Sequence, residues 1–145
     1  MKRKLIALSL SMVTVLTMGT TSLAKNNSDS NLPGQIIRDL PTAFVTMKGT
    51  AQTKTRAKED KSGHYINNTS GMVLRVSSHA SSGQNTTGGG DSTKVSTGKW
   101  RISNYVKERG YSKCYLKINT YNFGVRGMLS GKWSPDSAGS YPYAK

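Results

Sequence analysis

Aromatic and basic side chains alternate along one stretch of the C-terminal half of the sequence. Tyr111, Lys113, Tyr115 and Lys117 stand at every second position. In a β-strand, alternate side chains point to the same face of the sheet, so these four residues would share one surface. Aromatic rings stack on sugars or bases while ammonium groups pair with phosphates. The same residue types also suit an ordinary solvent-facing strand. The pattern therefore predicts a candidate binding surface but does not identify its ligand.

A second set of side chains could support hydrolysis of a phosphodiester. A ribonuclease needs a general acid, a general base and cations around a phosphate. The sequence offers Glu59 or His64 with His79, Arg56 and Arg75. Both histidines adjoin a turn or a loop, and nothing in their spacing fixes them relative to each other. We therefore expect both to be exposed and solvated, and we predict that the protein is not an enzyme.

Two motifs bear on metals and cofactors. Residues 88–92 (GGGDS) resemble a calcium loop, but Asp91 is the only acid between Asp60 and Glu108, and calcium needs several carboxylate or carbonyl oxygens. Zinc is poorly served by two histidines fifteen positions apart and a single cysteine. We predict no metal and no cofactor.

Cys114 is the only cysteine, so no intramolecular disulfide can form. It shares a predicted strand face with Leu116 and Ile118. A lone cysteine on an apolar face usually behaves as a small hydrophobic residue. We expect Cys114 to be buried and unreactive.

The elements that would position these residues are short strands separated by turns. Period-2 alternation and Gly, Asn and Pro breaks predict strands at residues 42–48, 50–58, 65–66, 72–79, 99–102, 111–119 and 125–133. Residues 81–93 form a Gly/Ser/Thr-rich loop, and residues 104–109 could form one or two helical turns. The chain is predicted to be all-β, a small antiparallel β-sandwich or partly open barrel with at most one short helix.

In the strand predicted at residues 50–58, strict alternation assigns each side chain to a face. Gln52, Lys54, Arg56 and Lys58 fall on one face, and small residues such as Ala51 fall on the other. The alternation therefore predicts a half-buried strand in which Lys58 shares a face with Gln52.

The N-terminal residues have the pattern of an export signal. Three basic residues precede an apolar run at residues 5–18, and small side chains at Ser22 and Ala24 suit a signal peptidase. We predict cleavage after Ala24, a flexible polar leader at residues 25–40 and one domain at residues 41–145. No second apolar stretch follows, so no transmembrane segment is expected in the mature chain, which would be extracellular.

The charge balance limits the partners. The chain has 21 Lys and Arg against seven Asp and Glu, a net charge of +14. Removal of the three basic signal residues would leave +11. A positive field attracts anionic polymers and surfaces, so the expected partners are anionic wall polymer, a lipid precursor or a membrane surface. Nucleic acid is a less favoured partner, and solubility alone is the competing explanation.

The segment Gly131-Lys132-Trp133-Ser134-Pro135-Asp136-Ser137 and the Thr- and Lys-rich first strands resemble small exported proteins of Gram-positive bacteria. Some of these proteins are grouped with bacteriocins of the lactococcin 972 type. The resemblance implies a cationic β-sandwich with an antibacterial or envelope-directed role, and it implies no functional residue.

Three hypotheses follow from the sequence. The first is a secreted, cationic, non-enzymatic protein that binds anionic cell-envelope components, including the possibility of a bacteriocin-like toxin. The second is a small secreted basic nuclease or other hydrolase. The third is a structural matrix or spore-surface component.

Overall fold

The computed structural model describes residues 26–38 and 49–145. These residues form eleven short strands and no helix, so the all-β prediction is confirmed. The strands are β1 (Ser30–Asn31), β2 (Ile36–Arg38), β3 (Ala51–Gln52), β4 (Arg56–Ala57), β5 (His64–Asn68), β6 (Leu74–Ala80), β7 (Thr93–Val95), β8 (Gly98–Ile102), β9 (Lys113–Thr120), β10 (Arg126–Met128) and β11 (Gly131–Ser134).

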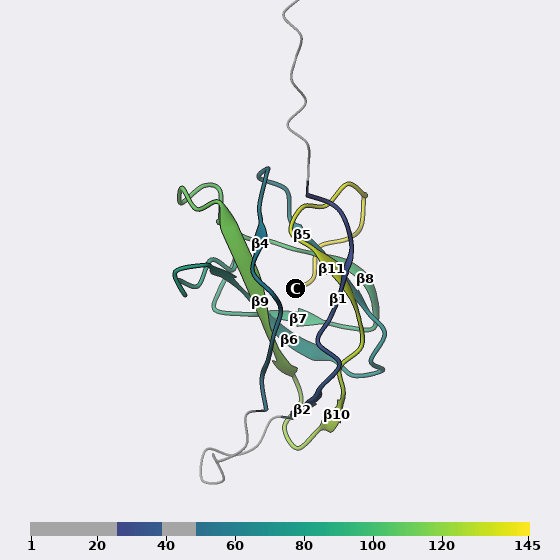
Figure 1. The fold of residues 1–145 in the computed structure, drawn as a ribbon. Helices are drawn as coiled ribbons and strands as arrows, with labels where there is room; N and C mark the ends of the chain where they lie inside the picture. Colours follow the sequence, from purple (N-terminus) through teal and green to yellow (C-terminus); the bar gives the residue numbers. More distant parts are fainter. Residues whose placement is uncertain (1–25, 39–48) are drawn as a thin grey trace, which may run out of the picture.

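Two antiparallel sheets face each other as a small sandwich (Figure 1). One sheet has four strands in the order β1-β11-β5-β8. The other has five strands, in the order β3-β9-β6-β7 with β4 also paired to β9. In Figure 1 the purple β1 runs beside the yellow β11, so strands from the early and late parts of the described chain meet in the four-stranded sheet.

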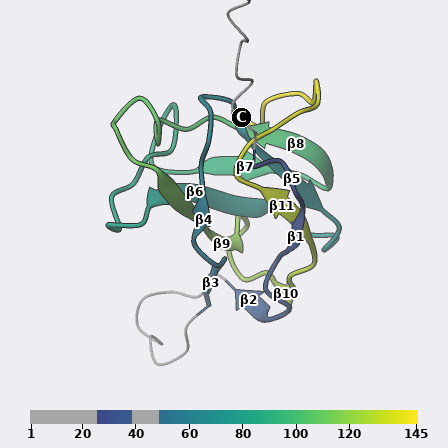
Figure 2. The same ribbon diagram turned by 45° about the horizontal axis from the view of Figure 1, so that its top comes forward.

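β2 and β10 pair with each other and lie together below the two sheets in both views (Figure 2). Leu32 and Ile37 are buried in the core, 5% and 0% exposed. Residues 26–38 are therefore part of the folded domain, which corrects the predicted leader for this stretch. The segment is polar overall, so its sequence did not indicate that Leu32 and Ile37 are buried. Nor did it indicate that the backbone of this segment pairs with β10 and β11.

A β-bulge separates β3 from β4. Gln52 pairs with Lys117, whereas Arg56 pairs with Cys114. Four steps along one strand thus oppose three along β9, so one extra residue is inserted, and an insertion of one residue reverses the alternation that follows it. Lys58 consequently points inward and is 1% exposed, whereas Gln52 is exposed, which corrects the predicted strand face that the two would share.

Apolar residues from both sheets fill the space between them. Cys114, Leu116 and Ile118 of β9 are fully buried, as predicted, together with Leu129 and Trp133. A close approach at the start of β11 requires glycine: Gly131 has a positive φ of 139°, and a Cβ there would collide with the backbone carbonyl of Asn67.

Of the remaining predictions, the helical turns need correction, the loop between β6 and β7 is confirmed, and two lie outside the described residues. Residues 104–109 form hydrogen-bonded turns rather than a helix, with the Asn104 side chain accepting from the Val106 amide. The loop at residues 81–93 is held by polar contacts, because Thr86 and Thr87 are buried against β6. The export signal and the strand predicted at residues 42–48 lie outside the described residues. Within the described ranges, no helix has the length and apolar character that crossing a membrane requires.

Candidate functional site

The structure separates the four residues of the predicted surface. Lys113 and Lys117 lie on the outer face of the five-stranded sheet, where Lys113 is exposed and Lys117 half-buried. Tyr115 is on the same face but is only 7% exposed, because its ring stacks on His79 with 5.4 Å between centroids. Tyr111 precedes β9 and packs against the core. The two lysines therefore remain available to a ligand, while the tyrosines have structural contacts.

Neighbouring strands add cations to that outer face. Arg75 of β6 pairs with Lys94 of β7, and Ser77 pairs with Lys117 of β9. The Tyr121 ring lies beneath both outer cations, 5.6 Å from the Arg75 guanidinium and 5.0 Å from Lys94 Nζ. We call Arg75, Lys94, Lys113, Lys117 and Tyr121 the basic face.

The basic face contains a shallow hollow of about 190 Å³. Arg75 and Lys117 line it, together with the polar residues Thr50, Ser77, Ser92 and Asn119 and the apolar Ile118. No carboxylate of the described residues forms an ion pair with these cations, since the described ion pairs are those of Lys58. Two cations and several hydrogen-bond donors around one hollow are suited to an oxyanion such as phosphate.

The two histidines of the predicted nuclease site do not converge. His64 and His79 are both buried, 0% and 8% exposed, which corrects their predicted exposure. His64 bonds to the inward-facing Ser78, whereas the neighbouring His79 points to the outer face and bonds to Ser77. Adjacent residues of a strand point to opposite faces, so the two histidines lie on opposite sides of the five-stranded sheet.

His64 is locked into one protonation state by its surroundings. Burial and the charge of Lys58 lower its pKa from 6.5 to about 4. Its Nδ1 lies 2.8 Å from the Pro135 carbonyl and its Nε2 2.7 Å from Ser78 Oγ. A neutral ring must then donate from Nδ1 and accept the Ser78 hydroxyl at Nε2. The Ser78 oxygen in turn accepts from Thr86 Oγ1, 2.9 Å away.

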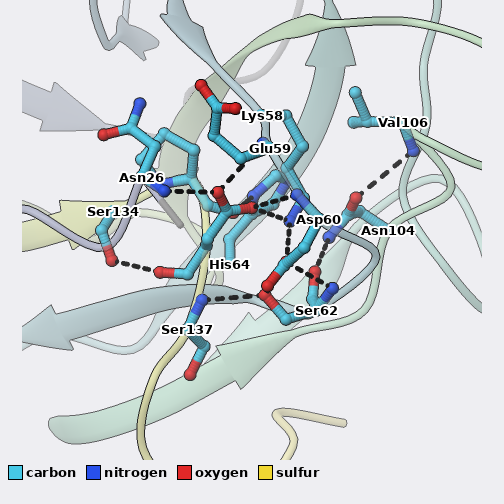
Figure 3. A network of polar contacts seen from close by, with 12 residues as sticks. Asn26, Lys58, Glu59, Asp60, Ser62, His64, Asn104, Val106, Ser134 and Ser137 are labelled. Carbon is cyan, nitrogen blue, oxygen red and sulfur yellow. Dashed lines mark hydrogen bonds and ion pairs between the residues drawn. The ribbon is translucent and has the colours of Figure 1, made fainter. Parts of the chain in front are cut away.

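A buried ionic cluster lies beside His64 (Figure 3). Lys58 Nζ contacts Asp136 Oδ1 directly, and both side chains are 0% exposed. Lys58 Nζ also lies 3.4 Å from Asp60 Oδ1. We call Lys58, Asp60 and Asp136 the Lys58 centre. Lys58 directly follows β4, and Asp136 lies in the segment after β11.

Backbone amides surround the Asp136 carboxylate. Its Oδ2 accepts from the Asn26 amide at 2.8 Å and the Glu59 amide at 3.0 Å, and its Oδ1 accepts from the Asp60 amide at 3.4 Å. These donors come from the N-terminal segment and from the turn after β4. Asp136 therefore joins three segments that are distant in sequence.

Asp60 is held as a carboxylate at the outer side of the cluster. Burial alone would raise its pKa, but hydrogen bonds from Ser62 and the charge of Lys58 outweigh burial and lower the pKa well below its usual range. Ser62 also accepts from the Ser137 amide at 2.9 Å (Figure 3). The residues around Asp60 thus tie the β4–β5 turn to the segment after β11.

The sequence contained a partial signal for the Lys58 centre. Asp136 follows Trp133, Ser134 and Pro135 in the segment that carried the family resemblance. That segment is buried from Trp133 to Ser137, and it packs on His64 and Lys58 rather than forming a surface. The partner Lys58 could not be identified, because the bulge that turns it inward leaves no mark in the alternation.

The described residues contain no group of three or more His, Cys, Asp or Glu side chains arranged to hold a metal ion. In the loop at residues 88–92, Asp91 is exposed and its backbone carbonyl accepts from the Asn85 side chain at 2.8 Å. That hydrogen bond has a structural role in the loop.

A family model described as "Protein of unknown function (DUF2712)" matches residues 20–137. Neither a curated protein nor a solved structure gives a significant match to the chain. The matched range includes the basic face and the Lys58 centre.

Proposed function

The chain belongs to the DUF2712 family of unknown function, and we propose that it is an exported, cationic, non-enzymatic protein that binds anionic cell-envelope components through its basic face. The hollow on that face is the observation that supports the proposal. Arg75 and Lys117 line it without an acidic partner among the described residues. Arg75 donates to the Tyr121 carbonyl at 3.3 Å, a neutral partner that leaves its charge available to an external anion.

Phosphate is the anion that this hollow fits best. Arg75 offers a planar fork of donors, Lys117 a compact charge, and Ser77 and Ser92 lie within the lining. Charge-assisted hydrogen bonds of this kind are stronger than those between neutral groups. Teichoic acids, lipid-linked wall precursors and phospholipid headgroups all carry phosphate, so they share the chemistry that the hollow would recognise.

The distribution of charge supports a polymeric or surface partner. Ten Lys and Arg residues lie on the eleven strands of the described chain, and none of those strands contains Asp or Glu. The described acids are all in loops and turns. Such a field steers anionic polymers toward the sheets.

Three further hypotheses from the sequence bear on this proposal: a bacteriocin-like action, a nuclease and a matrix component. A bacteriocin-like action on a phosphate-bearing lipid precursor rests on the resemblance of residues 131–137 to the lactococcin 972 type. The nuclease alternative cannot pair His64 with His79, because the two side chains lie on opposite sides of the five-stranded sheet; it stays a hypothesis in which Glu59 would take the place of His64. A matrix component would self-associate through exposed strand edges.

The proposal is tested by binding at increasing ionic strength. The protein is titrated with cell walls that carry teichoic acid, with the same walls stripped of teichoic acid, and with vesicles of anionic or neutral phospholipid. Because the Debye length falls from about 10 Å at 0.1 M salt to about 3 Å at 1 M, binding should weaken steeply as salt rises. It should also require phosphate-bearing material. Binding that is independent of salt and unchanged by removal of phosphate would overturn the proposal.

A further inference from the structure

The Lys58 centre lies inside the sandwich, and the proposed function makes no use of it. Burying a lysine and an aspartate carries a large desolvation penalty for each ion. Apolar residues of similar volume often replace a buried ion pair without loss of stability. An ion pair alone is therefore a weak explanation for placing Lys58 and Asp136 in full burial.

We propose that Lys58 and Asp136 condense, joining Lys58 Nζ to Asp136 Cγ in an intramolecular isopeptide bond, with Asp60 as the proton relay. The nucleophile and the carboxyl group are already in direct contact. The third group, Asp60 Oδ1, lies 3.4 Å from the nitrogen. The bond would tie the end of the β3–β4 strand to the segment that follows β11.

The amides around Asp136 would stabilise the addition step. When an amine adds to a carboxyl carbon, negative charge develops on one oxygen. Asp136 Oδ2 already receives the Asn26 and Glu59 amides at 2.8 and 3.0 Å. Two preoriented backbone donors at such an oxygen form the arrangement that lowers the barrier in acyl transfer. The other oxygen, Oδ1, faces Lys58 and is the one that would leave.

The atoms balance without an oxidant or a second substrate. A proton passes from the Lys58 ammonium to the Asp136 carboxylate, which gives a neutral amine and a carboxylic acid. The nitrogen lone pair forms the N–C bond, and Asp60 takes a proton from that nitrogen. Asp60 then returns the proton to the departing Oδ1 hydroxyl, so one water leaves and one amide remains.

The site favours this reaction because the reacting groups lie close together and bulk water is excluded. Intramolecular groups in reacting geometry reach effective molarities on the order of 10⁵–10⁸ M. The Lys58 and Asp136 side chains are both 0% exposed, so bulk water is excluded from the new amide. His64 presents its Nδ1 hydrogen to the Pro135 carbonyl and is thereby kept from accepting a proton from Lys58 at that nitrogen.

Intact mass spectrometry of the purified, folded protein tests the proposal, with its N-terminus read by sequencing. The expected mass is lower by one water than the mass calculated from that N-terminus. Tryptic digestion should give one branched peptide that joins the segments around Lys58 and Asp136, with no cleavage after Lys58. A full calculated mass, with both residues recovered in separate unmodified peptides, would overturn the proposal.

Variants separate the isopeptide bond from other losses of water. Lys58→Met should have its full calculated mass, whereas Lys61→Met, at a neighbouring exposed lysine, should still be lighter by one water. Asp136→Asn should lose ammonia instead of water, and Asp60→Asn should retain a large uncondensed fraction. A loss of water that persists in Lys58→Met would indicate a cyclised aspartate elsewhere and contradict the proposal. If Lys58→Met fails to fold, the wild-type peptide map still decides the question.

Discussion

His64 lies between the two sheets with both ring nitrogens in hydrogen bonds and no exposed surface. The fold therefore uses this histidine as a neutral connector between β5, β6 and the segment after β11. Burial is the larger cause of its lowered pKa, and the charge of Lys58 before condensation lowers the affinity of the ring for a proton further. Burial has turned a residue type associated with acid–base catalysis into part of the core.

Acidification should destabilise the fold through His64. Its pKa is 6.5 when unfolded and about 4 in the fold, so the unfolded state binds more protons between these values. Stability is fully present above pH 6.5 and should fall by up to about 1.4 kcal/mol per pH unit down to pH 4. Urea denaturation at several pH values measures this slope.

The His64→Gln variant is the control for that slope. Burial also lowers the pKa of His79, so some acid sensitivity should remain in the variant. The difference between the two proteins isolates His64. An identical slope in both would mean that His64 is not neutral in the fold.

Cys114 should resist thiol reagents in the folded protein. It is 0% exposed and burial raises its pKa to about 12, so thiolate is scarce and access is blocked. Labelling should be slow under native conditions and rapid in denaturant. Rapid native labelling would place Cys114 on the surface and reverse the face assignment of β9.

At the scale of elements, β2 shows how a short, polar-flanked segment becomes part of the core. Ile36 and Ile37 are adjacent and identical in type, yet Ile36 is 43% exposed and Ile37 fully buried. Ile37→Ala should destabilise the fold by about 2–5 kcal/mol, while Ile36→Ala should change it by much less. Denaturant midpoints of the two variants provide the comparison.

Equal effects of the two isoleucine substitutions would contradict the pairing of β2 with β10. Small effects from both substitutions would indicate that residues 26–38 are a leader rather than part of the folded domain. The pair is matched because the same atoms are removed at neighbouring positions.

The sequence predicted elements better than their connections. Alternation located β9 and β6 and the inward face of Cys114, because hydrophobic period and burial agree there. It could not place Lys58, since the bulge between β3 and β4 is an insertion relative to β9 and leaves no mark in the local pattern. It also missed β1 and β2, whose pairing partners lie about a hundred residues away.

The candidate binding surface could be predicted only in part, because the sequence of one strand does not show which strands lie beside it. Lys113 and Lys117 follow from the period of one strand. Arg75 and Lys94 join them only through the order β9-β6-β7, which local sequence does not specify. The stacking of Tyr115 on His79 likewise depends on the register between β6 and β9.

At the scale of the whole molecule, cations lie on the strands and described acids in the connections. Both sheets present positive charge outward: Lys99 and Lys132 are exposed on the four-stranded sheet, opposite the basic face. A general attraction to anions would use both sheets equally. The proposed binding uses the basic face in particular, because Arg75 and Lys117 share a hollow there.

The most direct test compares two variants of equal charge. One carries Arg75→Gln, Lys94→Gln and Lys117→Gln on the basic face. The other carries Lys61→Gln, Lys99→Gln and Lys132→Gln at exposed positions elsewhere. Binding to teichoic-acid-bearing walls is measured at 0.1 M salt, with folding of each variant checked by its denaturant midpoint. The account predicts at least a tenfold loss of affinity for the first variant and little change for the second; equal losses in both would contradict it.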